Sequence, residues 1–140
     1  LTYPLRTITV RVRLGEDRRM LTMTFCLHRL PSLSQEEFSE YWFEKHAPVV
    51  ASVRDALKIQ RYVQFHGAMN EIDEVLRATR GSPEGYDGVA QLWWESVETF
   101  EAAAASPEGL EAGMALLEDE QKFIDLTRSP IFVKVGREIF

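Results

Sequence analysis

Cysteine is nearly absent from this chain, since Cys26 is the one thiol among its 140 residues. A single cysteine excludes a disulfide within the chain and a cysteine-rich zinc site, and it fits a reducing, cytoplasmic setting. The Gly-rich phosphate loop, HExxH and CxxC motifs are missing, so the common nucleotide-dependent, zincin and thiol-redox mechanisms lose support. No run of about 18 apolar residues occurs, and residues 1–20 lack the apolar core of a signal peptide.

Positive charge is scarce outside the first 20 residues. Residues 1–20 carry five arginines against Glu16 and Asp17, a charge of +3, so the total of −6 leaves −9 for the remaining residues. An acidic body repels phosphate backbones and anionic lipid surfaces. We therefore expect neither a nucleic acid nor a membrane as a partner.

What the chain does have is strand-like alternation at regular intervals, within the length of one domain. Leu21, Met23, Phe25 and Leu27 share one face of the first such segment. Strands are predicted at residues 21–29, 56–66, 86–95 and 131–140. In the third of these, Trp93 and Trp94 must point to opposite faces of the sheet.

Helix-start signals occupy the intervals between these strands. Ser34 and Glu37 form a capping box, and Pro107 follows Ser106 at the favoured first position of a helix. Further helices are predicted to begin at Asn70 and after Ser96, and the last helix is predicted to bury a stripe of four residues, Leu110, Met114, Leu117 and Ile124. The order β-α-β-(α)-β-α-β predicts an α+β fold of the ferredoxin-like, split βαβ type, with a four-stranded antiparallel sheet and helices on one face.

The other face of such a sheet has no cover within the chain, so we expect a homodimer. Residues 21–140 form the predicted domain. Residues 7–14 alternate as well, which favours an extra strand; the alternative is that residues 1–20 are an arm preceding the domain proper.

Four segments of the chain form a familiar set: "FCLHRLPSLSQEEFSEYWFEKHAPVV", "RYVQFH", "YDGVAQLWWES" and "DEQKFIDL". Through them the sequence resembles the EthD-like family of the dimeric α/β-barrel superfamily, and the resemblance covers residues 21–140. Its most specific part is the motif of Phe38, Tyr41, Trp42, His46 and Pro48. The chain departs from the family at His28, where relatives often carry another polar or basic residue, and in residues 1–20.

This resemblance implies ferredoxin-like protomers that pair sheet to sheet, each with a small-molecule pocket between sheet and helices. Relatives include proteins linked to ether catabolism, fungal polyketide dehydratases and cyclases, and cofactor-free oxygenases that form quinones. The family is often labelled oxidoreductase. Neither a metal nor an organic cofactor is implied for this chain.

His46 is the leading catalytic candidate. It follows Phe38 by eight residues and Trp42 by four, which places it on the buried face of the predicted helix. Pro48 interrupts that helix near Ala47 and frees carbonyls, one of which we expect to hold an imidazole nitrogen. His46 then acts either as a structural stop or as a general acid/base beside a pocket lined by Trp42, by Trp93 or Trp94, and by the second strand.

The remaining polar candidates lie near strand ends. His66 and Tyr62 share one face of the second strand, and Asp87 precedes the third. Each has an ordinary structural alternative as a surface, turn or core residue. The candidate supporting or substrate-binding residues are His66, Tyr62, Asp87, Trp42, Trp94 and His28. The three histidines lack close ligand spacing, so no metal site is expected.

Two functions from different classes fit these residues. The first is an enzyme that uses histidine acid/base chemistry on a hydrophobic, aromatic or polyketide-like substrate, either oxidising it or eliminating water and cyclising it. The second is a non-catalytic binding or accessory protein that serves a degradative or biosynthetic oxygenase. A haem-degrading relative on the same fold is a third possibility, for which His46 would be the axial ligand.

Overall fold

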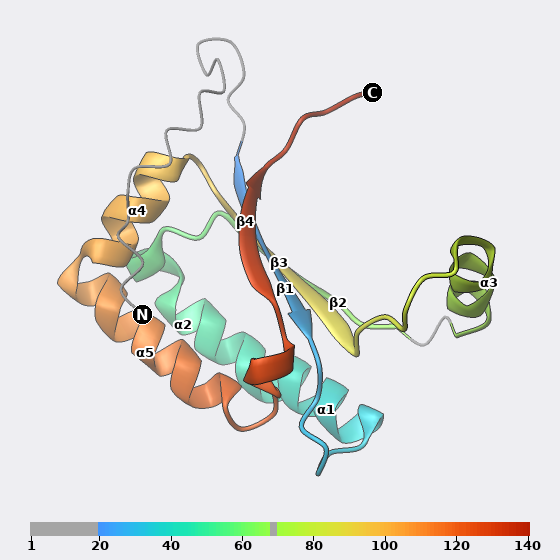
Figure 1. Cartoon of the computed structure of the whole chain (residues 1–140). Helices are drawn as coiled ribbons and strands as arrows, with labels where there is room; N and C mark the ends of the chain where they lie inside the picture. Colours follow the sequence, from blue (N-terminus) through green and yellow to red (C-terminus); the bar gives the residue numbers. More distant parts are fainter. Residues whose placement is uncertain (1–19, 68–69) are drawn as a thin grey trace.

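The computed structural model describes residues 20–67 and 70–140 as a sheet covered on one face by helices (Figure 1). The sheet is antiparallel throughout, in the order β2-β3-β1-β4. Its strands are β1 (Leu21–Leu27), β2 (Arg61–Phe65), β3 (Gly88–Trp94) and β4 (Ile131–Val135). This order, with crossovers on one side, confirms the predicted ferredoxin-like α+β fold.

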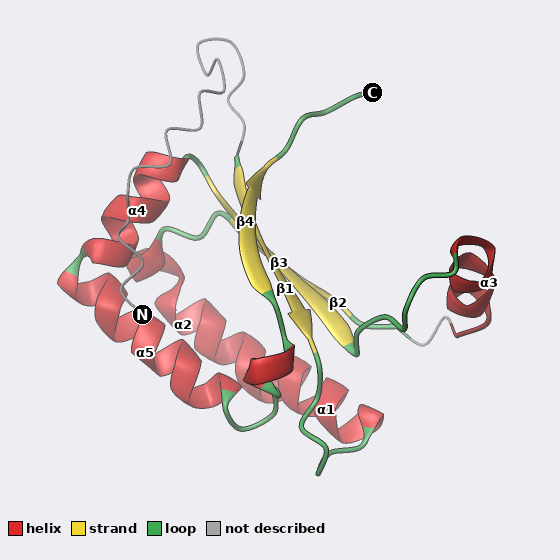
Figure 2. Cartoon of the chain, in the orientation of Figure 1, coloured by secondary structure: helices red, strands yellow, loops and turns green. Residues whose placement is uncertain are grey.

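The α-helices of the described residues form a layer over one face of the sheet, except for one helix that stands apart from it (Figure 2). The layer consists of α1 (Gln35–Tyr41), α2 (Ala47–Leu57), α4 (Val97–Ala105) and α5 (Pro107–Glu120). Helix α3 (Asn70–Arg80) extends beyond the ends of β2 and β3, and none of its residues is buried. The predicted strand at 7–14, and the arm at 1–20 except Met20, lie outside the described residues.

The predicted caps are present. The Ser34 side chain accepts from the Glu37 amide, and the Glu37 side chain accepts from the Ser34 amide, which completes the capping box. Ser106 caps α5 ahead of Pro107. These bonds satisfy amides that have no partner within their helix.

The core lies between the sheet and the helices. The buried faces of β1 and β3 pair Leu21 with Trp94 and Phe25 with Ala90. Phe38, Trp42 and Phe123 close this layer from the helix side and are almost fully buried. No helix of the described residues covers the opposite face of the sheet (Figure 1). Trp93 alternates with the buried Trp94 and so points to that face, where the Arg61 guanidinium carbon lies 4.7 Å from the centre of its ring. The prediction that the two tryptophans face opposite ways is confirmed.

Two expectations were wrong. The second strand begins at Arg61, because α2 continues to Leu57 and Lys58 then reverses the chain in a left-handed conformation with φ of 59°. The predicted buried stripe holds at Ile124, which is buried beyond the end of α5, but fails at its other three positions. Leu110, Met114 and Leu117 are exposed, whereas small residues such as Gly109 and Ala112 face the core. The helices approach closely there, since a Cβ on Gly109 would lie 1.8 Å from the Ala103 carbonyl oxygen.

Candidate functional site

A π-helical segment, Trp42–His46, joins α1 to α2 and places His46 in the interior. Phe38, Trp42, His46 and Val50 recur every four residues, and all four are buried. In an uninterrupted α-helix of 3.6 residues per turn, this spacing would rotate by about 40° at each step. The wider π turn absorbs that rotation, so all four side chains stay on one face. Pro48 sits in the first turn of α2, where its missing amide costs least.

His46 is held by a carboxylate from α5. Its Nδ1 lies 2.7 Å from Oδ2 of Asp119, and the Tyr41 hydroxyl donates to Oδ1 of the same residue at 2.7 Å. The imidazole also packs on Phe123, with ring centroids 4.9 Å apart. The expectation that a freed backbone carbonyl would hold this nitrogen was therefore wrong: the partner is a side chain 73 residues away.

The electrostatics of this pair favour neutral histidine beside ionised aspartate. Burial lowers the pKa of His46 from its ordinary 6.5, against the opposing pull of Asp119. Burial tends to raise the pKa of Asp119, but its bonds to Tyr41 and His46 outweigh that effect and lower it. Because an ionised carboxylate only accepts, the Nδ1 atom must carry the proton. Nε2 then holds a lone pair and can act as a base.

Two further groups around this pair have perturbed acidity. Burial, with the Asp119 bond adding to it, raises the pKa of Tyr41 to about 12, so its hydroxyl stays protonated and continues to donate. Glu120 follows Asp119 on α5 and is partly buried. Burial and the Asp119 charge raise the pKa of Glu120 to about 7. A carboxyl with that pKa can give or take a proton near neutrality.

A second polar chain runs from the α1 surface to Tyr62. The Ser39 hydroxyl lies 2.6 Å from Nδ1 of His66, and Nε2 of His66 lies 2.7 Å from the Gln64 carbonyl oxygen. The Gln64 amide nitrogen donates to the Tyr62 hydroxyl at 2.7 Å and to the Trp42 carbonyl at 2.9 Å. Since the Gln64 oxygen can only accept, His66 carries its proton on Nε2. Burial lowers the pKa of His66.

The two candidate tryptophans lie at opposite ends of β3. Trp42 rests on Gly88, where an added Cβ would come within 2.4 Å of its ring, and it stacks on His66 at 4.3 Å. Trp94 is at the other end of β3, donates to the Leu57 carbonyl at 2.7 Å and packs edge-on against Phe100. Trp42 therefore belongs to the site around His46 and His66, and Trp94 has a core position.

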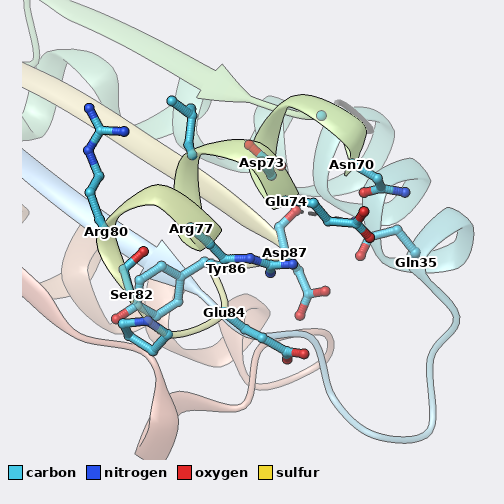
Figure 3. Close-up of a pocket in the computed structure, with 14 residues that line it drawn as sticks. Gln35, Asn70, Asp73, Glu74, Arg77, Arg80, Ser82, Glu84, Tyr86 and Asp87 are labelled. Atoms are coloured by element: carbon cyan, nitrogen blue, oxygen red, sulfur yellow. Dashed lines mark hydrogen bonds between the residues drawn. The ribbon is translucent and has the colours of Figure 1, made fainter.

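His28 and Asp87 form a separate group, at the end of the sheet where β1 finishes and β3 begins. The Asp87 carboxylate accepts from the Arg29 amide at 2.8 Å and lies 3.9 Å from Nδ1 of His28, which stacks on Tyr86. Asp87 and Tyr86 also line an open cavity of about 1040 Å³ below α3, with Arg77 and Glu84 beside them (Figure 3). Asp87 thus contacts His28 and Arg29, whereas Asp119 contacts His46.

Sequence reasoning missed Asp119, Tyr41's bond to it, and Glu120. Asp119 falls in the acidic run "EDEQK", which is typical of a solvated helix end, and only the crossing of α5 over α2 brings it to His46. The one signal available was the position of Asp119 four residues before Phe123, which is buried. Within residues 20–67 and 70–140, no three potential ligand side chains gather into a metal-binding group. No helix in that part is long and apolar enough to cross a membrane.

Known proteins are similar to this chain in sequence and in fold. The conidial pigment biosynthesis dehydratase EthD of Metarhizium robertsii is 28% identical over 123 residues, 84% of this chain and 83% of that protein. Dehydratase ustZ of Ustilaginoidea virens is 23% identical, covering 86% of each chain. A Thermobifida fusca structure described as a dimeric ferredoxin-like protein of unknown function superposes with a TM-score of 0.53 at 8% identity, covering 86% of this chain and 93% of its own. The family model described as "EthD domain" matches residues 30–127. This chain is therefore a member of the EthD domain family.

Proposed function

We propose that this protein is a dehydratase that removes water from a hydrophobic β-hydroxy ketone of aromatic or polyketide-like character. The observation that carries the proposal is the buried His46–Asp119–Tyr41 set, with its free Nε2 lone pair. The two fungal relatives named as dehydratases support elimination over oxidation as the reaction class.

The proposed reaction needs one base and one acid. Nε2 of His46 takes the proton from the carbon next to the ketone, and that C–H electron pair becomes a C=C bond. The C–O bond to the β-hydroxyl breaks, and the departing hydroxide receives a proton and leaves as water. Glu120, whose pKa lies near 7, is our candidate for that second proton. The substrate undergoes no net oxidation or reduction, so residue acid/base chemistry suffices.

Asp119 has a positioning role in this scheme. It fixes the imidazole tautomer, and its negative charge stabilises the imidazolium that forms when His46 gains the proton. Tyr41 in turn holds the second carboxylate oxygen. A positioned base contributes roughly a hundred- to ten-thousandfold in rate, so the substrate must already be acidified by its carbonyl.

The test is a hydroxylated tetralone, a bicyclic β-hydroxy ketone whose loss of water gives a fluorescent naphthol. The protein should produce the naphthol at equal rates in air and under argon, with no oxygen consumed at an electrode. Oxygen uptake in step with turnover would show an oxygenase. Binding of the tetralone without conversion, across a panel of such ketones, would show an accessory binding protein. Either result would overturn the dehydratase proposal.

A further inference from the structure

A groove between α2 and the edge strand β2 has not been used by the proposed chemistry. It has a volume of about 210 Å³, and Ala47, Val50 and Ile59 form its apolar walls. Ala47 directly follows His46, and Val50 lies one turn beyond it on the same helix. The groove therefore lies along the helix that follows the candidate base in the chain.

The charged residues along this groove are of one sign. Arg54 and Arg61 line it, and no acidic residue does. The Arg61 guanidinium lies over Trp93 on the other face of the sheet, so Arg54 supplies the charge of the groove. Arg54 donates to the carbonyls of Ile59 and Gln60 at 3.2 Å each, and these neutral acceptors leave its charge in place. Among the described residues, neither arginine forms an ion pair with a carboxylate. The groove thus carries a local positive charge on a protein whose net charge is −6.

Tyr62 lines the same groove and carries a hydroxyl group. Its oxygen accepts from the Gln64 amide, and Gln64 is fixed in that orientation because its own oxygen faces Nε2 of His66. The Tyr62 oxygen has therefore used one of its own acceptor sites on the Gln64 N–H, and its proton remains available for another group. Burial raises the pKa of Tyr62, which keeps that proton in place.

We infer that this groove binds one aromatic ring that carries both an oxygen acceptor and a carboxylate. The ring packs between Val50 and Ile59, its hydroxyl or carbonyl oxygen accepts from Tyr62, and its carboxylate meets Arg54. A volume of 210 Å³ lies below the range of about 300–1000 Å³ for drug-sized ligands, so it suits a single ring. The identity of this ligand as substrate or product rests on the proposed function, but its binding does not.

The inference is tested by calorimetric titration with para-hydroxybenzoate and, as its neutral counterpart, para-hydroxybenzamide. We expect the acid to bind roughly threefold to tenfold more tightly than the amide, because only the acid gains the arginine interaction. In Arg54→Gln this preference should disappear, and in Arg54→Lys part of it should remain. Tyr62→Phe should weaken both ligands, roughly tenfold for the loss of a buried donor.

The matched control is Arg77→Gln, which removes the same charge from the cavity below α3. It should leave both affinities unchanged. Equal affinity of wild-type protein for acid and amide, absence of binding, or a loss of affinity in Arg77→Gln would overturn the inference. Thermal midpoints of the variants establish that each is folded. Because the titration involves no turnover, failure of tetralone dehydration would refute the dehydratase proposal while leaving this result intact.

Discussion

Replacing Glu120 by glutamine should change the way stability depends on pH. The Glu120 carboxyl is partly buried next to Asp119, and burial together with that charge raises its pKa from 4.5 to about 7. At a pH between these two values the Glu120 carboxyl holds a proton in the folded protein and releases it in the unfolded chain. The contribution of this protonated carboxyl to stability is therefore fully present below pH 4.5 and is lost as pH rises through about 7.

The magnitude follows from the same two pKa values. Each pKa unit corresponds to about 1.4 kcal/mol, so the span from 4.5 to about 7 amounts to roughly 3 kcal/mol of destabilisation above neutral pH. This is an upper value, because the side chain retains some contact with water. Glutamine has nearly the shape of protonated glutamate but cannot ionise. Glu120→Gln should thus match the wild type at pH 4 and exceed its free energy of unfolding by up to about 3 kcal/mol at pH 8.

Urea denaturation at fixed protein concentration, repeated from pH 4 to pH 8, measures this difference. Glu118→Gln is the matched control, since Glu118 is an exposed carboxylate on the same helix. Its difference from wild type should stay small and flat across the series. A difference between Glu120→Gln and wild type that is the same at pH 4 and pH 8 would refute the reasoning about this buried carboxyl.

Three other predictions follow from the site and the sheet. Gly88→Ala places a methyl group against the Trp42 ring and should cost about 1–3 kcal/mol in urea denaturation, and equal stability would contradict that contact. The pH profile of kcat/KM should fall on the acid side as His46 is protonated, at a pH below the ordinary pKa of 6.5. Asp119→Asn removes the negative charge beside His46, so it should lower the rate and move the acid limb of the profile to lower pH. An acid limb that does not move would exclude coupling between Asp119 and His46. The uncovered sheet face should be buried in a homodimer, so monomers at micromolar concentration in sedimentation would disprove it.

The fold was predictable because its signals are local. Alternation located all four strands, and the Ser34, Ser96 and Ser106 caps located three helix starts. The end of α2 was missed because a left-handed Lys58 has no strong sequence signal, unlike a glycine in the same place. The prediction assigned the exposed face of α5 to the core, because it expected large apolar side chains such as leucine and methionine to be buried. The close approach of the helices leaves room only for glycine and alanine on the buried face.

The site was predictable only in part, because its bonds join distant segments. The buried position of His46 followed from its spacing to Phe38 and Trp42. Its bond to Asp119 depends on how α5 crosses α2, which periodicity does not determine. The Gln64 link between His66 and Tyr62 was likewise hidden, because it depends on side-chain orientation along one strand.

The central claim is that Nε2 of His46 removes the proton that begins dehydration. The most direct measurement compares naphthol formation from the hydroxylated tetralone by wild-type protein and by His46→Gln, with equal thermal midpoints as the condition for comparison. We predict that His46→Gln loses turnover roughly a hundred- to ten-thousandfold. A folded His46→Gln protein that dehydrates the ketone at the wild-type rate would contradict the account.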